Sequence, residues 1–543
     1  MGAHYNKREE TIVTDRNRRA LMQASAAAAA TSLFGIPEQV LAQAARGGTF
    51  VMGLPQSPRS LNPAIQSGAA VMIPGAQLFA TPLKFDAKWQ PQPFLAERWI
   101  LSDDARSVTL FLRKDAKFHD GRPITSADVQ FSVETVRDNH PFKSMFGPVN
   151  GVTLTDAHTA VIRLSEPHPA LLLAMSSALL PILPKHIFGD GQPITTHPRN
   201  GNPVGSGPFK LVEFKPGEHV ILERFDGFFL KDRPMLDRFI VRFFRDPASM
   251  LLALERGEID AHTGLVDARE IERAKKIPGI QFYTRGGPAI GSLNWVAINN
   301  RHPQLSDKRV RQAIAYALDK QFILKSLLGG VHDRATGPIA AASPFYSADV
   351  EKYDLNLQKA GALLDAAGLK PKADGTRLAL NIDYLPGVSD AKVIAEYAKP
   401  ALAKVGIDVT VRASPDFPTW VRRTSTFNYD LSVDTAWNWG DPVIGVHRTY
   451  LSSNIREGVP WSNTQGYKNP KVDELLAQAG RERDVNKRKQ FYREFQKIVV
   501  DDCPVIYIHE TNFHAAYQRK VANPPTGIWG TLESMDELAL RKA

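Results

Sequence analysis

The chain has 543 residues, of which 43% are apolar and 23% charged. At about 150 residues per domain this length gives about three to four domain-sized units, and the composition excludes a disordered or collagen-like chain. The 67 Lys and Arg residues exceed the 57 Asp and Glu residues by 10, but they are dispersed. The densest basic segment, 481–489, is interrupted by Glu482 and Asp484, so no nucleic-acid-binding surface is expected. The single cysteine, Cys503, excludes an intramolecular disulfide and a metal cluster of several cysteines.

The first 44 residues have the order of an export signal. Arg18 and Arg19 precede an uncharged, alanine-rich run over 20–37, and the small residues Ala42 and Ala44 follow where a signal peptidase would cut. Residues 17–23 resemble the twin-arginine export motif, and an ordinary Sec signal is the alternative. The run is too short for a stable membrane anchor, and no cysteine lies near the cut for lipid attachment. We therefore expect a mature chain from about Ala45, free in the periplasm.

Beyond this signal, strand patterns alternate with helix patterns. The expected strands are 47–54, 107–113, 152–154, 160–164, 209–212, 220–222, 239–244, 293–298, 378–384, 408–412 and 505–509. The expected helices are one beginning after Thr125 and those at 247–256, 307–318, 357–367, 391–405 and 487–500. We expect segment 338–354 to be a surface loop. Strands separated by helices of about 10 to 15 residues predict α/β layers, and the hairpins of the first half add antiparallel pieces.

Catalytic and metal signatures are missing from the sequence. The glycines of 201–210 lack the Lys and Ser or Thr of a phosphate-binding loop, and there is no Gly-x-Ser-x-Gly nucleophile motif. His509 and His514 are one residue too far apart for the two-histidine zinc motif, and they follow a strand rather than lie on a helix. We therefore expect a binding protein without a metal or another cofactor rather than an enzyme.

Several segments resemble one protein family. Residues 95–129 carry the longest match, and 202–209, 255–260, 308–319 and 466–476 extend it over nearly all of the mature chain. These segments are similar to those of the family 5 extracellular solute-binding proteins, the dipeptide-, oligopeptide- and nickel-binding components of ABC importers. The resemblance implies a two-lobed α/β fold of the class II periplasmic-binding type, which closes on its ligand like a hinge.

The resemblance also implies a domain plan and partners. Residues 45–288 would form the first lobe, with an extra subdomain at about 80–200. Residues 289–508 would form the second lobe, and 509–543 would return to the first. The protein would be a monomer that delivers a peptide or peptide-like solute to ABC permease subunits, which work with cytoplasmic ATPases.

The expected ligand site includes the stretch Thr435–Pro442, which resembles the family's Gly-Trp…Asp-Pro segment lining the cleft. Peptide-binding members have an aspartate there that pairs with the ligand's ammonium group. Only Asn438, Trp439 and Gly440 separate Trp437 from Asp441 in this chain, so this aspartate is missing unless Asp441 or Asp434 takes its role. Without that aspartate, the resemblance to peptide-binding members favours an unmodified peptide ligand less strongly.

Further candidates are aromatic walls and carboxylate-binding arginines. Alternation along a strand would place Trp437 and Trp439 on one face, where they would form a stacking wall, with core packing as the alternative. The other candidates are Trp461 and Asn463 as a second wall and an amide, Arg422, Arg423 and Arg448 as carboxylate forks or surface arginines, and Asn294 and Trp295 near the passage between the lobes.

Two other functions remain open from the sequence. An exported hydrolase of peptide-like compounds would need a nucleophile with a base in reach, and a chaperone-like binder of unfolded chains would need an open cleft. Within the solute-binding class, the ligand could be a di- or tripeptide, a modified peptide, an opine-like amino-acid conjugate or a chelated metal.

Overall fold

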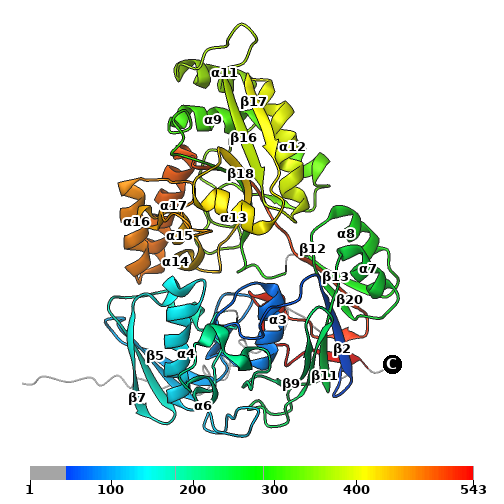
Figure 1. Ribbon diagram of the computed structural model, residues 1–543. Coiled ribbons are helices and arrows are strands. Elements are labelled where there is room, and N and C mark those ends of the chain that lie inside the picture. The colour runs from blue at the N-terminus through cyan, green and yellow to red at the C-terminus, as the bar shows by residue number, and fades with distance from the viewer. Residues whose placement is uncertain (1–43, 178, 285, 542–543) are drawn as a thin grey trace, which may run out of the picture.

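The computed structural model describes residues 44–177, 179–284 and 286–541, so the predicted export signal lies, apart from Ala44, outside the described residues. Two lobes are stacked on each other (Figure 1), and the two-lobed α/β architecture expected from the sequence is confirmed. No helix of the described part of the chain is long and apolar enough to cross a membrane.

The first lobe is built on a seven-stranded sheet with the order β13-β20-β12-β2-β11-β10-β9. Its strands are β2 (Thr49–Leu54), β9 (Phe209–Lys215), β10 (His219–Arg224), β11 (Arg238–Phe243), β12 (Ala261–Leu265), β13 (Ile280–Tyr283) and β20 (His514–Gln518). Its helices are α3 (Ala69–Leu78), α5 (Leu171–Ala174), α6 (Lys185–Phe188), α7 (Pro247–Glu255) and α8 (Ala268–Lys275). Two smaller sheets join β1 (Ala44–Ala45), β21 (Val521–Ala522) and β22 (Ala539–Arg541), and β3 (Leu83–Phe85) with β4 (Pro91–Pro93).

An extra subdomain is inserted between β2 and β9 of this lobe. Its antiparallel sheet has the order β5-β6-β8-β7, with β5 (Ala96–Leu101), β6 (Ser107–Leu112), β7 (Val149–Asp156) and β8 (Thr159–Leu164). Helix α4 (Ser126–Asn139) packs on it and begins where predicted, because the Asp128 carboxylate accepts the Thr125 N–H at 2.8 Å. The residues after α4 lie next to the second lobe.

The second lobe has a six-stranded sheet with the order β15-β19-β14-β18-β16-β17. Its strands are β14 (Ser292–Ile298), β15 (Asp333–Arg334), β16 (Leu378–Tyr384), β17 (Ile407–Arg412), β18 (Leu431–Trp437) and β19 (Val505–Glu510). Its helices are α9 (Lys308–Ala317), α10 (Lys320–Phe322), α11 (Leu357–Ala366), α12 (Ser389–Ala403), α13 (Phe417–Ser425), α14 (Pro442–Gly445), α15 (His447–Tyr450), α16 (Pro470–Arg481) and α17 (Val485–Asp502).

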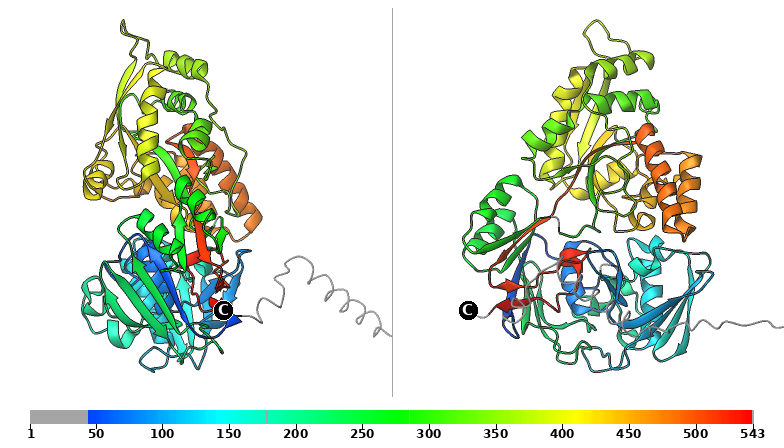
Figure 2. Two further views of the ribbon diagram at one scale, coloured as in Figure 1. Left: turned by 90° about the vertical axis from the view of Figure 1, so that its right-hand side faces the viewer. Right: turned by 180° about the vertical axis from the view of Figure 1, so that it is seen from behind.

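The chain passes between the two sheets in two places. The first passage follows β13 and enters β14, and the second is the short segment 511–513 between β19 and β20. Figure 2 shows both passages on the same side of the molecule. The apolar core of the first lobe also includes Trp439 and Ile444, which follow β18 of the second lobe. The lobes are therefore in direct side-chain contact.

Most expected elements are present within a few residues of their predicted limits, but one expectation was wrong and another holds only in part. Strand β18 ends at Trp437, and Trp439 lies beyond it with a left-handed φ of 50°, so the two tryptophans do not share a strand face. Segment 338–354 lacks helix and strand as expected, but Ile339, Ala340 and Tyr353 in it are buried. It is therefore not simply a surface loop.

Candidate functional site

Aromatic side chains join the lobes at the end of β18. The ring of Trp439 lies 4.9 Å from that of Phe142, after α4, and 6.2 Å from that of Trp529, near the C-terminus. Trp437 is half-buried and stacks on Phe513 of the second passage, with centroids 6.2 Å apart and planes 12° apart. The two tryptophans still neighbour each other, at 6.4 Å. These rings form an aromatic cluster built from both lobes, in which Trp439 is part of the buried core.

The backbone after β18 is fixed to the first passage. The N–H groups of Asn438 and Gly440 donate to the carbonyls of Gly291 and Ala289, at 3.0 and 2.6 Å. Trp439 between them adopts the left-handed conformation, which is costly for a bulky residue. Its indole N–H is buried without a partner among the described residues. Trp439 thus combines a strained backbone with an unsatisfied indole donor.

Arg448 on α15 reaches the same junction. Its guanidinium lies 4.7 Å from the centroid of the Phe142 ring, and its buried Nε has no hydrogen-bond acceptor. The remainder of the side chain stays partly accessible, and no ion pair joins it to another described residue. Burial lowers the pKa of Arg448 to about 10, against the opposing effect of Asp434. The group remains charged at neutral pH, with free donors at the interface between the lobes.

Asp434 is the acidic counterpart of Arg448. It lies on β18 opposite Trp295, is buried, and accepts the Thr435 N–H at 2.6 Å. Burial raises the pKa of Asp434 to about 7, although the Thr435 N–H, the Trp461 indole and the Arg448 guanidinium each lower it. Within the described structure, no nitrogen of the Arg448 guanidinium lies within 4.0 Å of an Asp434 carboxylate oxygen, so the two side chains form no ion pair. Two opposite charges are therefore near each other without neutralising each other directly.

Trp461 supplies an aromatic surface beside Asp434. Its ring stacks on Phe417 at 5.5 Å and lies 6.3 Å from the buried Trp420. Trp461 also adopts a left-handed φ, of 51°, and is half-buried. Trp461 thus shares the left-handed backbone of Trp439, and its indole is near enough to Asp434 to lower the pKa of that carboxyl.

Asp441, a leading candidate from the sequence, is held in the scaffold. Arg488 donates to both of its carboxylate oxygens at 2.7 and 2.8 Å, and Asp441 also caps α14 by accepting the Val443 N–H. Burial alone would raise the pKa of Asp441, but the Arg488 guanidinium more than offsets this and lowers it. A carboxylate so engaged has little capacity left for a ligand's ammonium group.

Three other candidates also lie outside the junction or are engaged elsewhere. Asn463 is fully buried; its amide bonds the carbonyls of Leu451 and Tyr467 and accepts the Tyr467 N–H. Arg422 is exposed on α13, and Arg423 donates to Asp383 at 3.1 Å. These side chains stabilise the second lobe or face solvent.

Asn294 and Trp295 are adjacent on β14 and therefore point to opposite faces of the sheet. Trp295 packs against Tyr450 and Tyr507, at 6.5 and 6.2 Å, and its buried N–H has no partner among described residues. The Asn294 amide lies 3.5 Å from the Thr435 hydroxyl, on the face opposite to Asp434. Of the pair, only Trp295 lies on the Asp434 side.

Sequence reasoning missed the contributions of the first lobe. Phe142, Phe513 and Trp529 complete the aromatic junction, but each lies far along the chain from 434–461 and carries no local motif. The sequence did contain one signal, since Asp434 was the stated alternative to Asp441.

Comparison with known proteins gives the context for this geometry. The model of the bacterial extracellular solute-binding proteins, family 5 (middle part), matches residues 90–458. The probable D,D-dipeptide-binding periplasmic protein DdpA of Escherichia coli (strain K12) is 27% identical over 79% of this chain and 80% of its own length.

Solved structures of solute-binding proteins are similar to this chain over most of its length. NikZ from Campylobacter jejuni in complex with Ni(L-His) has a TM-score of 0.79 at 25% identity, over 90% of this chain and 97% of that chain. The oligopeptide-binding protein AppA from Bacillus subtilis, in complex with a nonapeptide, has a TM-score of 0.78 at 25% identity, over 92% of this chain and all of that chain. The family resemblance expected from the sequence is confirmed: this chain belongs to the bacterial extracellular solute-binding proteins of family 5.

Proposed function

We propose that the protein is the exported binding component of an ABC importer, and that it holds a peptide-like solute with a free carboxylate between its lobes. The observation that carries this proposal is the Arg448 guanidinium, which lies at the junction of the lobes without an acceptor among the described residues. Arginine binds carboxylates through two parallel hydrogen bonds. A ligand carboxylate would satisfy donors that the protein alone leaves free.

The pairing of Arg448 with Asp434 favours a zwitterionic solute. A ligand ammonium group near Asp434 would lower the pKa of this carboxyl from about 7 and keep it ionised. Trp437, Trp439 and Trp461 would enclose the apolar part of the solute. In this proposal Asp434, rather than Asp441, replaces the ammonium-binding aspartate of the family.

The relatives support this class without selecting one solute. Their names and structures include a D,D-dipeptide, a nonapeptide and a nickel–histidine complex. Small zwitterions with a free carboxylate, namely di- and tripeptides, modified peptides, opine-like conjugates and amino-acid metal chelates, are therefore the ligands to test. Capture would close the lobes 45–288 and 289–508 about their two passages, and the closed monomer would dock on permease subunits.

A thermal-shift screen of the mature chain from Ala45 tests the proposal. A solute that binds the folded chain stabilises it and raises the melting temperature, and the stabilisation grows with the logarithm of the ratio of solute concentration to Kd. Any solute found is then titrated by calorimetry against the wild type, Arg448→Lys, and Arg422→Lys as an exposed arginine control. We expect only the Arg448 change to weaken binding; equal affinity of all three proteins would refute the proposed anchor.

The hydrolase alternative has no support at this junction, where the free groups are an arginine, an aspartate and indoles rather than a nucleophile with its base. We propose that the protein is not an enzyme, and that a bound solute is recovered with unchanged mass after long incubation.

Export is proposed to follow the twin-arginine route, so Arg18→Lys combined with Arg19→Lys is expected to keep the precursor inside the cell. Export of this double variant at the normal rate would favour the Sec route instead.

A further inference from the structure

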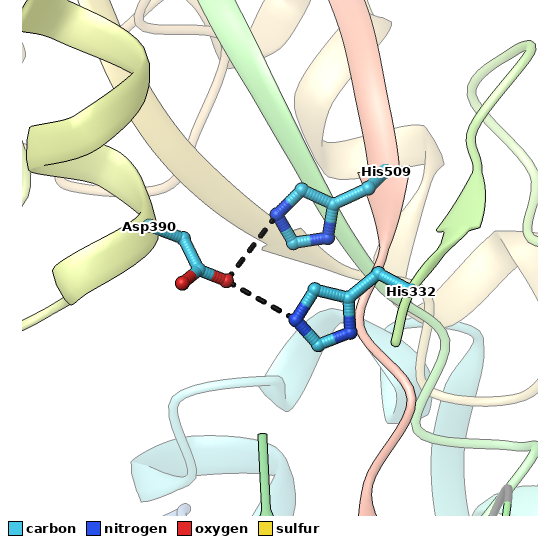
Figure 3. A group of neighbouring side chains, drawn as sticks. All are labelled: His332, Asp390 and His509. Atoms are coloured by element: carbon cyan, nitrogen blue, oxygen red, sulfur yellow. Dashed lines mark ion pairs between the residues drawn. The ribbon is translucent and has the colours of Figure 1, made fainter. Parts of the chain in front are cut away.

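A second cluster of polar side chains lies in the second lobe, beside the second passage. His332 precedes β15, His509 lies on β19, and Asp390 lies in the first turn of α12. The Nε2 atoms of His332 and His509 lie 3.2 and 3.5 Å from Oδ2 of Asp390 (Figure 3). The two imidazole rings are parallel, with centroids 4.6 Å apart and planes 7° apart. Three segments distant in sequence thus direct potential metal ligands to one point.

The two histidines are buried, Asp390 is partly buried, and the hydrogen bonds of the imidazoles are incomplete. His509 is 0% exposed and His332 is 6% exposed. Neither Nε2 makes a hydrogen bond within the described structure, although each faces the same carboxylate oxygen, and Nδ1 of His509 is also unpartnered. A buried polar group without a partner is costly. An occupant that accepts electron pairs from both rings would remove that cost.

A neighbouring side chain offers another oxygen. Asn294 lies directly opposite His509 in the β14–β19 pairing, so the two side chains emerge on the same face. The amide oxygen of Asn294 is buried and has no partner among the described residues. The unsatisfied atoms are therefore three imidazole nitrogens and an amide oxygen, and two of these nitrogens face the Asp390 carboxylate.

We propose that His332, Asp390 and His509 bind a divalent transition-metal ion, with zinc as the best match. Two imidazoles and one carboxylate suit zinc, and such a set leaves a fourth position for water or for the Asn294 oxygen. Ligands about 2.0 to 2.1 Å from a tetrahedral ion lie about 3.3 Å from one another, close to the 3.2 and 3.5 Å observed between nitrogen and oxygen. The three ligand atoms lie within 4.8 Å of one another, so they can converge on one ion when the two parallel rings tilt toward it.

The site is connected to the second passage through one hydrogen bond. Nδ1 of His332 accepts the N–H of Asn512 at 3.3 Å, and Asn512 lies in the segment 511–513. With Nδ1 as acceptor, the proton of the neutral ring is on Nε2. A metal ion on Nε2 moves that proton to Nδ1, which then cannot accept from Asn512. Metal binding and this contact therefore oppose each other, and a bound ion would alter the passage between the lobes.

Zinc titration of the metal-free mature chain, without any solute, tests the proposal independently of the transport function. The proteins are the wild type, His332→Gln, His509→Gln, and His302→Gln as control, because His302 lies in the same lobe outside the cluster, 3.8 Å from Asp430. We expect one ion per chain for the wild type and the control, and an at least tenfold weaker affinity for each cluster variant, by calorimetry.

Circular dichroism first establishes that each variant is folded, and anomalous scattering at the zinc edge locates the ion in crystals. Should a variant unfold, Asp390→Asn, which keeps the size of the side chain, replaces it. A single zinc peak between the two rings supports the proposal. Absence of binding to the folded wild type, or equal binding by the cluster variants and His302→Gln, would overturn it.

Discussion

The guanidinium of Arg448 lies over the ring of Phe142, 4.7 Å from its centroid, and thereby joins a short helix of the second lobe to the extra subdomain of the first. Such cation–π contacts contribute about 0.5 to 2 kcal/mol. They leave the in-plane N–H groups of the guanidinium free, so Arg448 can contact the opposite lobe and a ligand carboxylate at once. Lobe closure and solute binding are thus linked through one side chain.

Replacement of Arg448 should weaken solute binding strongly. A hydrogen bond to a charged group contributes about 1.5 to 3 kcal/mol, which corresponds to roughly 10- to 150-fold in Kd. We expect a loss of this size for Arg448→Ala by calorimetry. Arg422→Ala, which removes an exposed arginine, should bind as the wild type does. Comparable losses in both variants would indicate a general effect of net charge instead.

Asp434 should make binding depend on pH. Burial raises its folded-state pKa to about 7, so below this pH the carboxyl is protonated and cannot pair with an ammonium group. Affinity for a zwitterion should rise by up to about tenfold per unit as pH increases toward 7 and then level off. Asp434→Asn should flatten the profile. A wild-type profile that is already flat from pH 5 to 8 would exclude Asp434 from the site.

The Asp434 carboxyl should also make folding stability depend on pH. Whereas solute affinity rises with pH, the contribution of this carboxyl to the free energy of unfolding falls. Since its folded pKa is raised above the unfolded value, the folded chain holds an extra proton between about pH 4 and 7. The free energy of unfolding therefore contains a term that decreases as pH rises through this range. In urea titrations of the solute-free chain, Asp434→Asn should lose less stability than the wild type between pH 4 and 7. An identical loss in both proteins would contradict the raised pKa.

Trp437 should be a binding residue and Trp420 a structural one. Trp437 is half-buried at the junction, whereas Trp420 is 1% exposed in the core of the second lobe. Trp420→Ala should reduce the free energy of unfolding by about 3 to 5 kcal/mol. Trp437→Ala should mainly weaken solute binding, by the roughly 0.5 to 1.5 kcal/mol of an aromatic contact. Unchanged affinity, or loss of folding, would assign Trp437 to the core.

The pair between Asp441 and Arg488 should matter for stability rather than specificity. Both side chains are buried, and removing one partner leaves the other charge uncompensated, at a cost of about 3 to 5 kcal/mol. Asp441→Asn should lower the urea midpoint accordingly while the order of preferred solutes stays the same. A changed order of solutes with an unaltered urea midpoint would restore Asp441 as a ligand contact.

Much of the fold follows from the sequence because local signals determine it. The α4 helix begins where Thr125 and Asp128 cap it, and the alternation of 107–113 matches β6, whose Val108, Leu110 and Leu112 are buried. Such patterns depend on neighbours a few residues apart. The end of β18 was misjudged because the left-handed turn at Trp439 has no glycine at that position to signal it.

The site was harder to predict, because its members meet only in the folded chain. Asp441 resembled a ligand anchor until Arg488, 47 residues later, was found to hold it. His509 has only His514 near it in the sequence, whereas the side chains around it in the fold are those of His332 and Asp390. Arg448 was one of three arginines that the sequence could not distinguish, and only its place against Phe142 separates it from the others.

Native mass spectrometry of the exported protein tests the central claim most directly, because it shows whether Arg448 holds a solute. The mature wild type, Arg448→Ala and Arg422→Ala are recorded before and after mild denaturation. We predict that the wild type and Arg422→Ala release one small solute per chain, that fragmentation shows a free carboxylate in it, and that Arg448→Ala carries none. Retention of the same solute by Arg448→Ala, in the same proportion as by the wild type, would contradict the account.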